Sequence, residues 1–176
     1  EIDFQQRKIY DVAIQTAGKD LVCTYVTSEK SGGVLSVLSF NYNERLEVSW
    51  QNHFYVDVDS ILKTSTYSKI PQSLKKKSKH NAELGYAIRS LKIVDDSLIN
   101  LALEQRYAYS VSDHPDAVEY YSSSFRYTHM LSIQMDSRGN HAKTYLLPKC
   151  QFGASRYYFS FASVTNSDKT YFIFND

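Results

Sequence analysis

Alternation of apolar and polar residues, interrupted by turn signals, constrains this chain more than any other feature of its sequence. Between residues 86 and 149, apolar residues recur at every second position in four runs. A period of two places successive side chains on opposite faces of a β-strand. Turn-forming clusters separate the runs at 95–97 and 136–140, where Gly139 can adopt a positive φ without steric cost. This stretch therefore predicts two successive β-hairpins.

The same pattern recurs on either side of that stretch. Residues 9–54 contain another four-strand unit, and residues 157–176 contain half of a third. Four-strand antiparallel units in series are typical of β-propeller blades. We therefore predict a single all-β domain over residues 1–176, built of antiparallel hairpin repeats, with propeller-like blades at 9–54 and 86–149 in an incomplete ring. An antiparallel β-barrel or β-sandwich is the alternative architecture.

Residues 55–85 break the strand pattern and are interpreted as an insertion between the two units. Within them, Ser60 can cap a short helix that runs to Ser68, and Pro71 would end any helix begun there. The basic run Lys75–Lys79 is expected to be a solvated loop.

The composition limits which class of protein this chain can belong to and which partners it is expected to bind. Hydrophobic residues make up 43% of the chain and charged residues 22%, which suits a folded core. The 15 tyrosines and 9 phenylalanines favour strands over helices. A net charge of +1 gives no attraction to nucleic acid, and no apolar run is long enough to span a membrane. Cys23 lies within a strand pattern, so it is interpreted as a buried free thiol.

Four short segments, 104–107, 136–140, 147–151 and 171–176, resemble segments of uncharacterised exported bacterial proteins with propeller-like repeats. The resemblance covers the second half of the chain. It implies a repeated β-fold, an extracellular or periplasmic location, and a continuation of the chain beyond residue 176, because two and a half blades cannot close a ring. It supplies no catalytic residues.

No motif for catalysis, metal binding or cofactor binding is visible. The five histidines lack the spacing of zinc ligands, and only six glycines leave little room for a phosphate-binding loop. We therefore assign no catalytic residue, expect no metal and no cofactor, and interpret the histidines as unconnected surface or core residues.

The candidate binding residues lie near one strand end and in the excursion that follows it. Glu104, Arg106 and Tyr107 close a strand and would line the rim or axial pocket of a propeller, while Tyr120 and Tyr121 would stack on a sugar ring or a protein partner. A solvated strand end, with Glu104 paired to Arg106 or a neighbour, and aromatic residues that simply pack across strands are the alternatives.

These observations predict a non-enzymatic binding or scaffold module whose ligand is a carbohydrate or a protein, because the sequence contains no visible nucleophile and base. The alternative is a polysaccharide-acting hydrolase that uses paired carboxylates, such as Asp57 and Asp59.

The last strand, residues 170–174, is apolar on both faces and would be prone to association if left bare. We expect it to be paired or covered by an earlier part of the chain, by a second copy in a homodimer, or by a C-terminal continuation.

Overall fold

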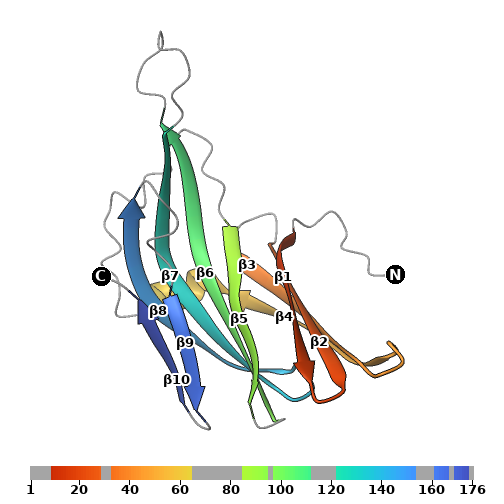
Figure 1. The fold of residues 1–176 in the computed structure, drawn as a ribbon. Coiled ribbons are helices and arrows are strands. Elements are labelled where there is room, and N and C mark those ends of the chain that lie inside the picture. Colours follow the sequence, from red (N-terminus) through yellow and green to blue (C-terminus); the bar gives the residue numbers. More distant parts are fainter. Residues whose placement is uncertain are drawn as a thin grey trace.

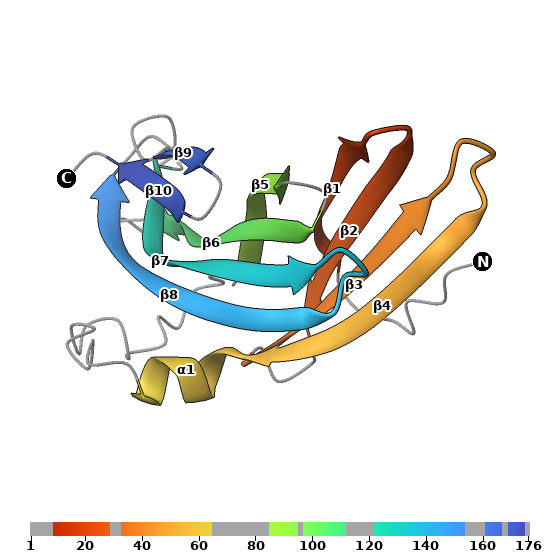
Figure 2. The same ribbon diagram turned by 90° about the horizontal axis from the view of Figure 1, so that it is seen from below.

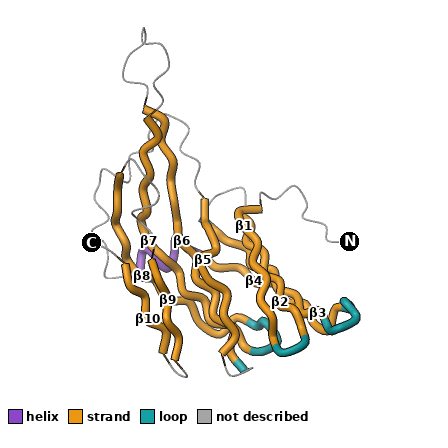
Figure 3. The backbone as a smooth tube through the Cα atoms, viewed as in Figure 1, coloured by secondary structure: helices purple, strands orange, loops and turns teal. Residues whose placement is uncertain are grey.

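The computed structural model describes residues 9–28, 33–64, 85–94, 97–111, 122–153, 161–166 and 169–174. Over these residues the protein is mostly β, with three antiparallel sheets of four, four and two strands and one short helix (Figure 1). The prediction of antiparallel β-hairpins is confirmed for these residues, which are mostly β and include one short helix. The three described sheets do not close into a ring, as the smooth backbone trace also shows (Figure 3).

Sheet A is formed by the first four strands, which are joined in sequence order. Its strands are β1 (Ile9–Ala17), β2 (Asp20–Ser28), β3 (Val34–Tyr42) and β4 (Val48–Asp57). The β1–β2 turn requires the positive φ of 60° at Gly18, a conformation that glycine adopts without the steric clash of a Cβ.

Sheet B repeats the arrangement, again in sequence order. Its strands are β5 (Gly85–Val94), β6 (Leu98–Val111), β7 (Ser122–Asp136) and β8 (His141–Gly153). The two strands that follow, β9 (Phe161–Asn166) and β10 (Lys169–Phe174), form an antiparallel hairpin. We call this pair of strands the C-terminal hairpin.

The helix between the two sheets differs from the sequence prediction. Helix α1 spans Val58–Thr64, and the Asp57 carboxylate rather than Ser60 caps it by accepting the Ser60 N–H at 2.9 Å. Aspartate is favoured at this position because its oxygen satisfies an N–H that has no partner within the helix. Strand β4 also continues past residue 54, because Val56 is buried and pairs with Leu35. The rest of the expected insertion, 65–84, lies outside the described residues.

Sheets A and B share one hydrophobic core. Alternate residues of sheet A, including Val22, Val26 and Leu35, pack with Leu101 and Leu131 of sheet B, and all five are essentially inaccessible to solvent. The alternation predicted from the sequence therefore directs one face of each sheet inward. Helix α1 adds Ile61 and Leu62 against the same core.

Part of the second face of sheet B lies beneath the C-terminal hairpin. The Lys92 ammonium donates to the carbonyl of Ser163 at 2.6 Å, and Asn100 Nδ2 donates to Thr170 Oγ1 at 3.3 Å. Lys92 and Asn100 oppose each other on β5 and β6, on the face away from the shared core. Sheet B is thus the middle layer of three, with sheet A on one side and the C-terminal hairpin on the other.

Strands of equal rank, meaning strands that hold the same position in the order of their own sheets, meet where the layers touch. First strands lie side by side, since β1 runs along β5 and the Ile88 N–H donates to the Asp11 carboxylate at 2.9 Å (Figures 1 and 2). Third strands meet where Ser39 Oγ lies 3.7 Å from Met135 Sδ, and fourth strands meet where the rings of Phe54 and His141 stack at 4.9 Å. The Lys92 and Asn100 contacts continue the pattern from β5 to β9 and from β6 to β10.

One glycine is required by this stacking. Gly139, in the β7–β8 turn, has a φ of 73° and is buried, and a Cβ there would lie 2.5 Å from the Trp50 ring. Trp50 belongs to β4, so the close approach joins the fourth strand of sheet A to the end of sheet B.

The last strand was expected to be paired or covered. β10 pairs along its length with β9, so its backbone is joined to an earlier part of the chain. Phe172 and Phe174 are half-buried, whereas Tyr171 and Ile173 on the opposite face are exposed. The structure therefore covers one of the two apolar faces.

Replacing a residue of the shared core should destabilise the protein strongly. Leu131→Ala removes a fully buried side chain and leaves a cavity, so we expect the free energy of unfolding to fall by about 2–5 kcal/mol. Ile14→Ala, at a position that is 64% exposed, is the control and should change it by less than about 0.5 kcal/mol. Urea unfolding monitored by circular dichroism measures both; equal effects would contradict the core assignment.

Candidate functional site

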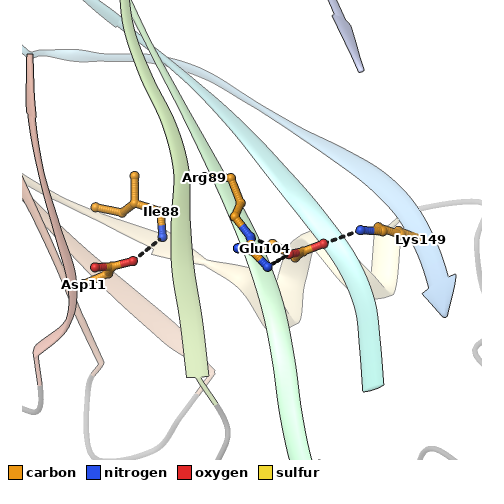
Figure 4. A network of polar contacts seen from close by, with 5 residues as sticks. All are labelled: Asp11, Ile88, Arg89, Glu104 and Lys149. Carbon is orange, nitrogen blue, oxygen red and sulfur yellow. Dashed lines mark hydrogen bonds and ion pairs between the residues drawn. The ribbon is translucent and has the colours of Figure 1, made fainter. Parts of the chain in front are cut away.

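Glu104 of β6 is the one predicted binding residue whose side chain the structure describes. It is fully buried, and it forms ion pairs with Arg89 of β5 and Lys149 of β8 (Figure 4). Arg89 Nε donates to Glu104 Oε2 at 2.6 Å, and the Lys149 ammonium donates to Oε1. Of the alternative for Glu104, the solvated position is wrong, because no part of its side chain reaches solvent, whereas the pairing with a neighbouring residue is present.

The surroundings of the ion pairs explain how a charged group is accommodated there. Lys149 is also fully buried, and its ammonium lies 5.5 Å from the centre of the Phe161 ring. A buried carboxylate is tolerated only when it is paired and hydrogen-bonded, and two cations meet that requirement for Glu104. The network spans sheet B from β5 to β8 and carries a formal charge of +1.

The other predicted binding residues are only partly located. Arg106 and Tyr107 continue β6 and pair with Tyr127 and Arg126 of β7, but their side chains lie outside the described part of the structure. Tyr120 and Tyr121 lie outside the described residues altogether. Their binding role remains a prediction.

His129 is buried in sheet B and links β7 to β5. Its Nε2 shares a hydrogen bond of 2.8 Å with the Tyr86 hydroxyl, and Tyr86 packs against Tyr10 of β1. Burial lowers the pKa of His129 from its ordinary 6.5 to about 4, because the charged form would lose its hydration. His129 is therefore neutral near pH 7.

A serine and a histidine meet on sheet A, which the sequence did not predict. Ser36 Oγ lies 2.6 Å from His53 Nε2, the distance expected of a nucleophile and its base. Ser36, however, is buried in the middle of β3 and is paired on both sides, with Thr27 and Tyr55. The backbone of Ser36 is thus engaged in the ladder on both sides, and its hydroxyl holds the His53 ring.

Several described carboxylates have structural roles. Hydrogen bonds from Ser60 hold the pKa of the Asp57 carboxyl below its usual value, and the Asn140 side chain does the same for the pKa of Asp136. The remaining hydrogen bonds of Asp136 close the β7–β8 turn. These groups stabilise a helix start and a turn.

One face of sheet A is the candidate binding surface. It is the face turned away from the shared core, and we call it the outer face of sheet A. Its residues follow from strand register: Val12, Ile14, Thr16, Leu21, Cys23, Tyr25, Thr27, Ser36, Leu38, Phe40, Tyr42, Val48, Gln51, His53 and Tyr55.

The outer face of sheet A contains no aspartate, glutamate, lysine or arginine among these described positions. Tyr25 and Phe40 meet edge to face at 5.9 Å, and Phe40 stacks on Tyr42 at 6.1 Å. Ile14 and Tyr55 are 64% and 51% exposed. The exposed apolar positions lie on the two edge strands β1 and β4, whereas Cys23, Ser36 and Phe40 on the central strands are buried. Exposed apolar side chains grouped on one face are a feature of interaction surfaces.

Cys23 lies on the same face. It is buried and free, as predicted, and burial raises the pKa of its thiol. Its role is packing beneath the aromatic side chains rather than thiolate chemistry.

Comparison with known proteins returned no match to any protein-family model, curated protein or solved structure. Among the described residues, no group of three or more histidine, cysteine, aspartate or glutamate side chains is placed to hold a metal ion. No helix within the described ranges is long and apolar enough to cross a membrane.

Replacing the buried carboxylate of Glu104 should destabilise the fold without changing any exposed side chain. Glu104→Gln leaves the Lys149 ammonium buried without its counter-ion, so we expect a loss of about 3–5 kcal/mol in the free energy of unfolding. Glu44→Gln is the control, because the Lys19–Glu44 pair is exposed and worth less than about 1 kcal/mol. The double variant Glu104→Met, Lys149→Met should recover most of the lost free energy of unfolding, as measured by urea unfolding. No recovery would contradict this account.

Stability should fall in acid because of His129. Its pKa is lower in the folded than in the unfolded chain, so its contribution is complete above pH 6.5 and is lost as the pH falls towards 4. A difference of this size corresponds to about 3 kcal/mol. Urea unfolding of wild type and His129→Gln between pH 7 and pH 4 isolates this contribution, and parallel pH profiles would show that His129 does not cause it.

Proposed function

We propose that this protein is a non-enzymatic binding or scaffold module that contacts its ligand through the outer face of sheet A. The observation that carries the proposal is the uncharged, aromatic character of that face. Ile14, Tyr55 and Val12 stand exposed on it, while charged residues such as Lys19 and Glu44 are paired at its rim. An apolar centre with a polar rim is the usual anatomy of a protein interface.

The placement of the described ionisable groups supports a binding role over catalysis. Glu104 is neutralised by two cations, Asp57 caps a helix and Asp136 closes a turn. Ser36 is held in mid-strand beside His53. A hydrolase of polysaccharides, the alternative function, needs two carboxylates facing each other across the substrate.

A protein ligand fits this face better than a sugar. Sugar recognition needs hydrogen-bonding groups around a stacking ring. On this face Val12 and Ile14 offer only aliphatic surface, and the exposed polar side chains beside Tyr55 are those of Gln51 and His53 on β4. The ring of Tyr55, which lies 4.7 Å from His53, is the position on this face where a sugar would stack. A glycan ligand is therefore kept as the second candidate.

We further infer that the layers are propeller-like blades rather than halves of a closed barrel. Contacts between strands of equal rank, such as β1 with β5, β4 with β8 and β5 with β9, support this reading. Successive blades of a propeller stack in this way, each beginning at its innermost strand. A β-sandwich of sheets A and B is the alternative.

Catalysis and sugar binding are tested on the same sample. We expect no turnover when the chain is incubated with a panel of chromogenic glycosides. Turnover that is abolished by changing one carboxylate would refute the binding role. On a glycan array, retention by wild type that is lost in Tyr55→Ala would identify a sugar ligand, and absence of retention supports a protein ligand. Tyr145→Ala, at an exposed tyrosine of β8, is the matched control.

A further inference from the structure

The edge strands of the two four-stranded sheets differ in how they are protected. Both sheets follow sequence order, and the first strands β1 and β5 lie side by side (Figure 2). Among the described strands of sheets A and B, β4 and β8 are therefore the remaining edges. An edge strand presents a row of backbone N–H and C=O groups that its own sheet does not pair. These two strands are where a further strand could be added.

Strand β8 has the features that prevent such an addition. Pro148 lacks a backbone N–H, Lys143 is exposed, and the charged side chain of Lys149 points into the protein. The register of β8 with β7 also shifts twice, which bends and twists the strand. Prolines, lysines, inward-pointing charges and bulges are the usual means of protecting an edge. The edge of β8 is therefore closed to a partner.

Strand β4 lacks these features over most of its length. Its register with β3 is unbroken from Trp50 to Asp57. It contains no proline, lysine or arginine, and no acidic residue before Asp57. Val48 and Tyr55 on this strand are 49% and 51% exposed. A long, regular and uncharged edge is the kind of strand to which an extended peptide pairs.

We propose that β4 accepts an extended peptide segment of a partner protein, which adds to sheet A as a further strand. This inference rests on the proposed binding role of sheet A and names the form of its ligand. Main-chain hydrogen bonds to β4 supply affinity in this mode of binding. Because neighbouring strands lie about 4.8 Å apart, alternate side chains of the peptide would contact Gln51 and Tyr55 and supply specificity.

The charges at the two ends of β4 favour a peptide of another protein over a second copy of this chain. Glu47 precedes the strand and Asp57 ends it, and both are exposed. If two β4 strands paired antiparallel, Glu47 of each copy would lie opposite Asp57 of the other, and parallel pairing would place each acid opposite itself. Like charges opposite each other destabilise a strand pair. A peptide with an uncharged centre and a lysine or arginine near each end has the complementary pattern.

Peptide selection followed by N-methylation tests the proposal. We expect panning of the whole chain with displayed linear peptides, somewhat longer than the 10 residues of β4, to select this charge pattern. N-methylating one residue at a time in a selected synthetic peptide should raise its Kd at every second position, by up to about tenfold, because alternate N–H groups donate to β4. Fluorescence polarisation measures each Kd.

One lysine placed on each edge provides the matched pair of protein variants. Gln51→Lys adds to β4 the kind of charge that protects natural edges, so it should raise the Kd of the selected peptide at least about tenfold. Tyr145→Lys, at an exposed position of β8, is the control and should bind like wild type. Circular dichroism confirms that each variant is folded, and Tyr55→Lys replaces Gln51→Lys if that variant does not fold.

The outcomes separate strand addition from other modes of binding. Failure to select any peptide, or an N-methylation profile without a period of two, overturns the inference. If such a peptide still loses its binding in Tyr55→Ala, the proposed role of the outer face of sheet A survives without strand addition. A wild-type dimer in sedimentation equilibrium that Gln51→Lys dissociates would show a second copy on this edge and would also overturn the inference. Glycoside turnover would refute the proposed function while leaving the Kd values unchanged.

Discussion

Strand β6 lies in a layer that is covered on both faces, and this constraint governs the rest of the structure. Seven consecutive side chains, from Ile99 to Gln105, are no more than 6% exposed. Residues on one face pack into the core shared with sheet A, and those on the other face lie beneath the C-terminal hairpin. Most strands of a twisted antiparallel sheet have one wet face, so a strand buried on both requires partners for every polar group it carries.

That requirement accounts for the polar contacts of the middle layer. Asn100 faces the hairpin and donates to Thr170, and Glu104 on the same face is held between Arg89 and Lys149. The ion pairs join β5, β6 and β8 across the sheet, so they fix the register of strands that do not neighbour one another. A buried ion pair adds little net stability over a well-packed apolar group, but removing one partner is costly. The network therefore contributes more to selecting one arrangement of the strands than to the net free energy of unfolding.

The outer layers differ from the middle layer, because each exposes some of its apolar side chains. Sheet A and the C-terminal hairpin expose apolar side chains such as Ile14 and Ile173 to solvent. Three of the described carboxylates, by contrast, are engaged in structure: Asp57 in a cap, Asp136 in a turn and Glu104 in an ion-pair network. The polar groups of the middle layer thus hold strands and layers together, and apolar side chains such as Ile14 and Ile173 are left among the exposed residues of the outer layers.

The sequence by itself determined the strands, their hairpins and the buried thiol of Cys23. Period-two alternation and turn chemistry are local properties, so they can be recognised within a few residues. The helix cap shows how local this information is. Asp57 and Ser60 are both residue types that cap helices, and only the position where β4 ends identifies Asp57 as the cap. For the candidate site, the sequence identified Glu104 as unusual but not its partners. Arg89 and Lys149 reach it from other strands, and Ser36 meets His53 only through the register of β3 and β4. The tertiary structure decided those pairs, and it decided which faces remain bare, because burial depends on how sheets stack and not on the alternation within a strand.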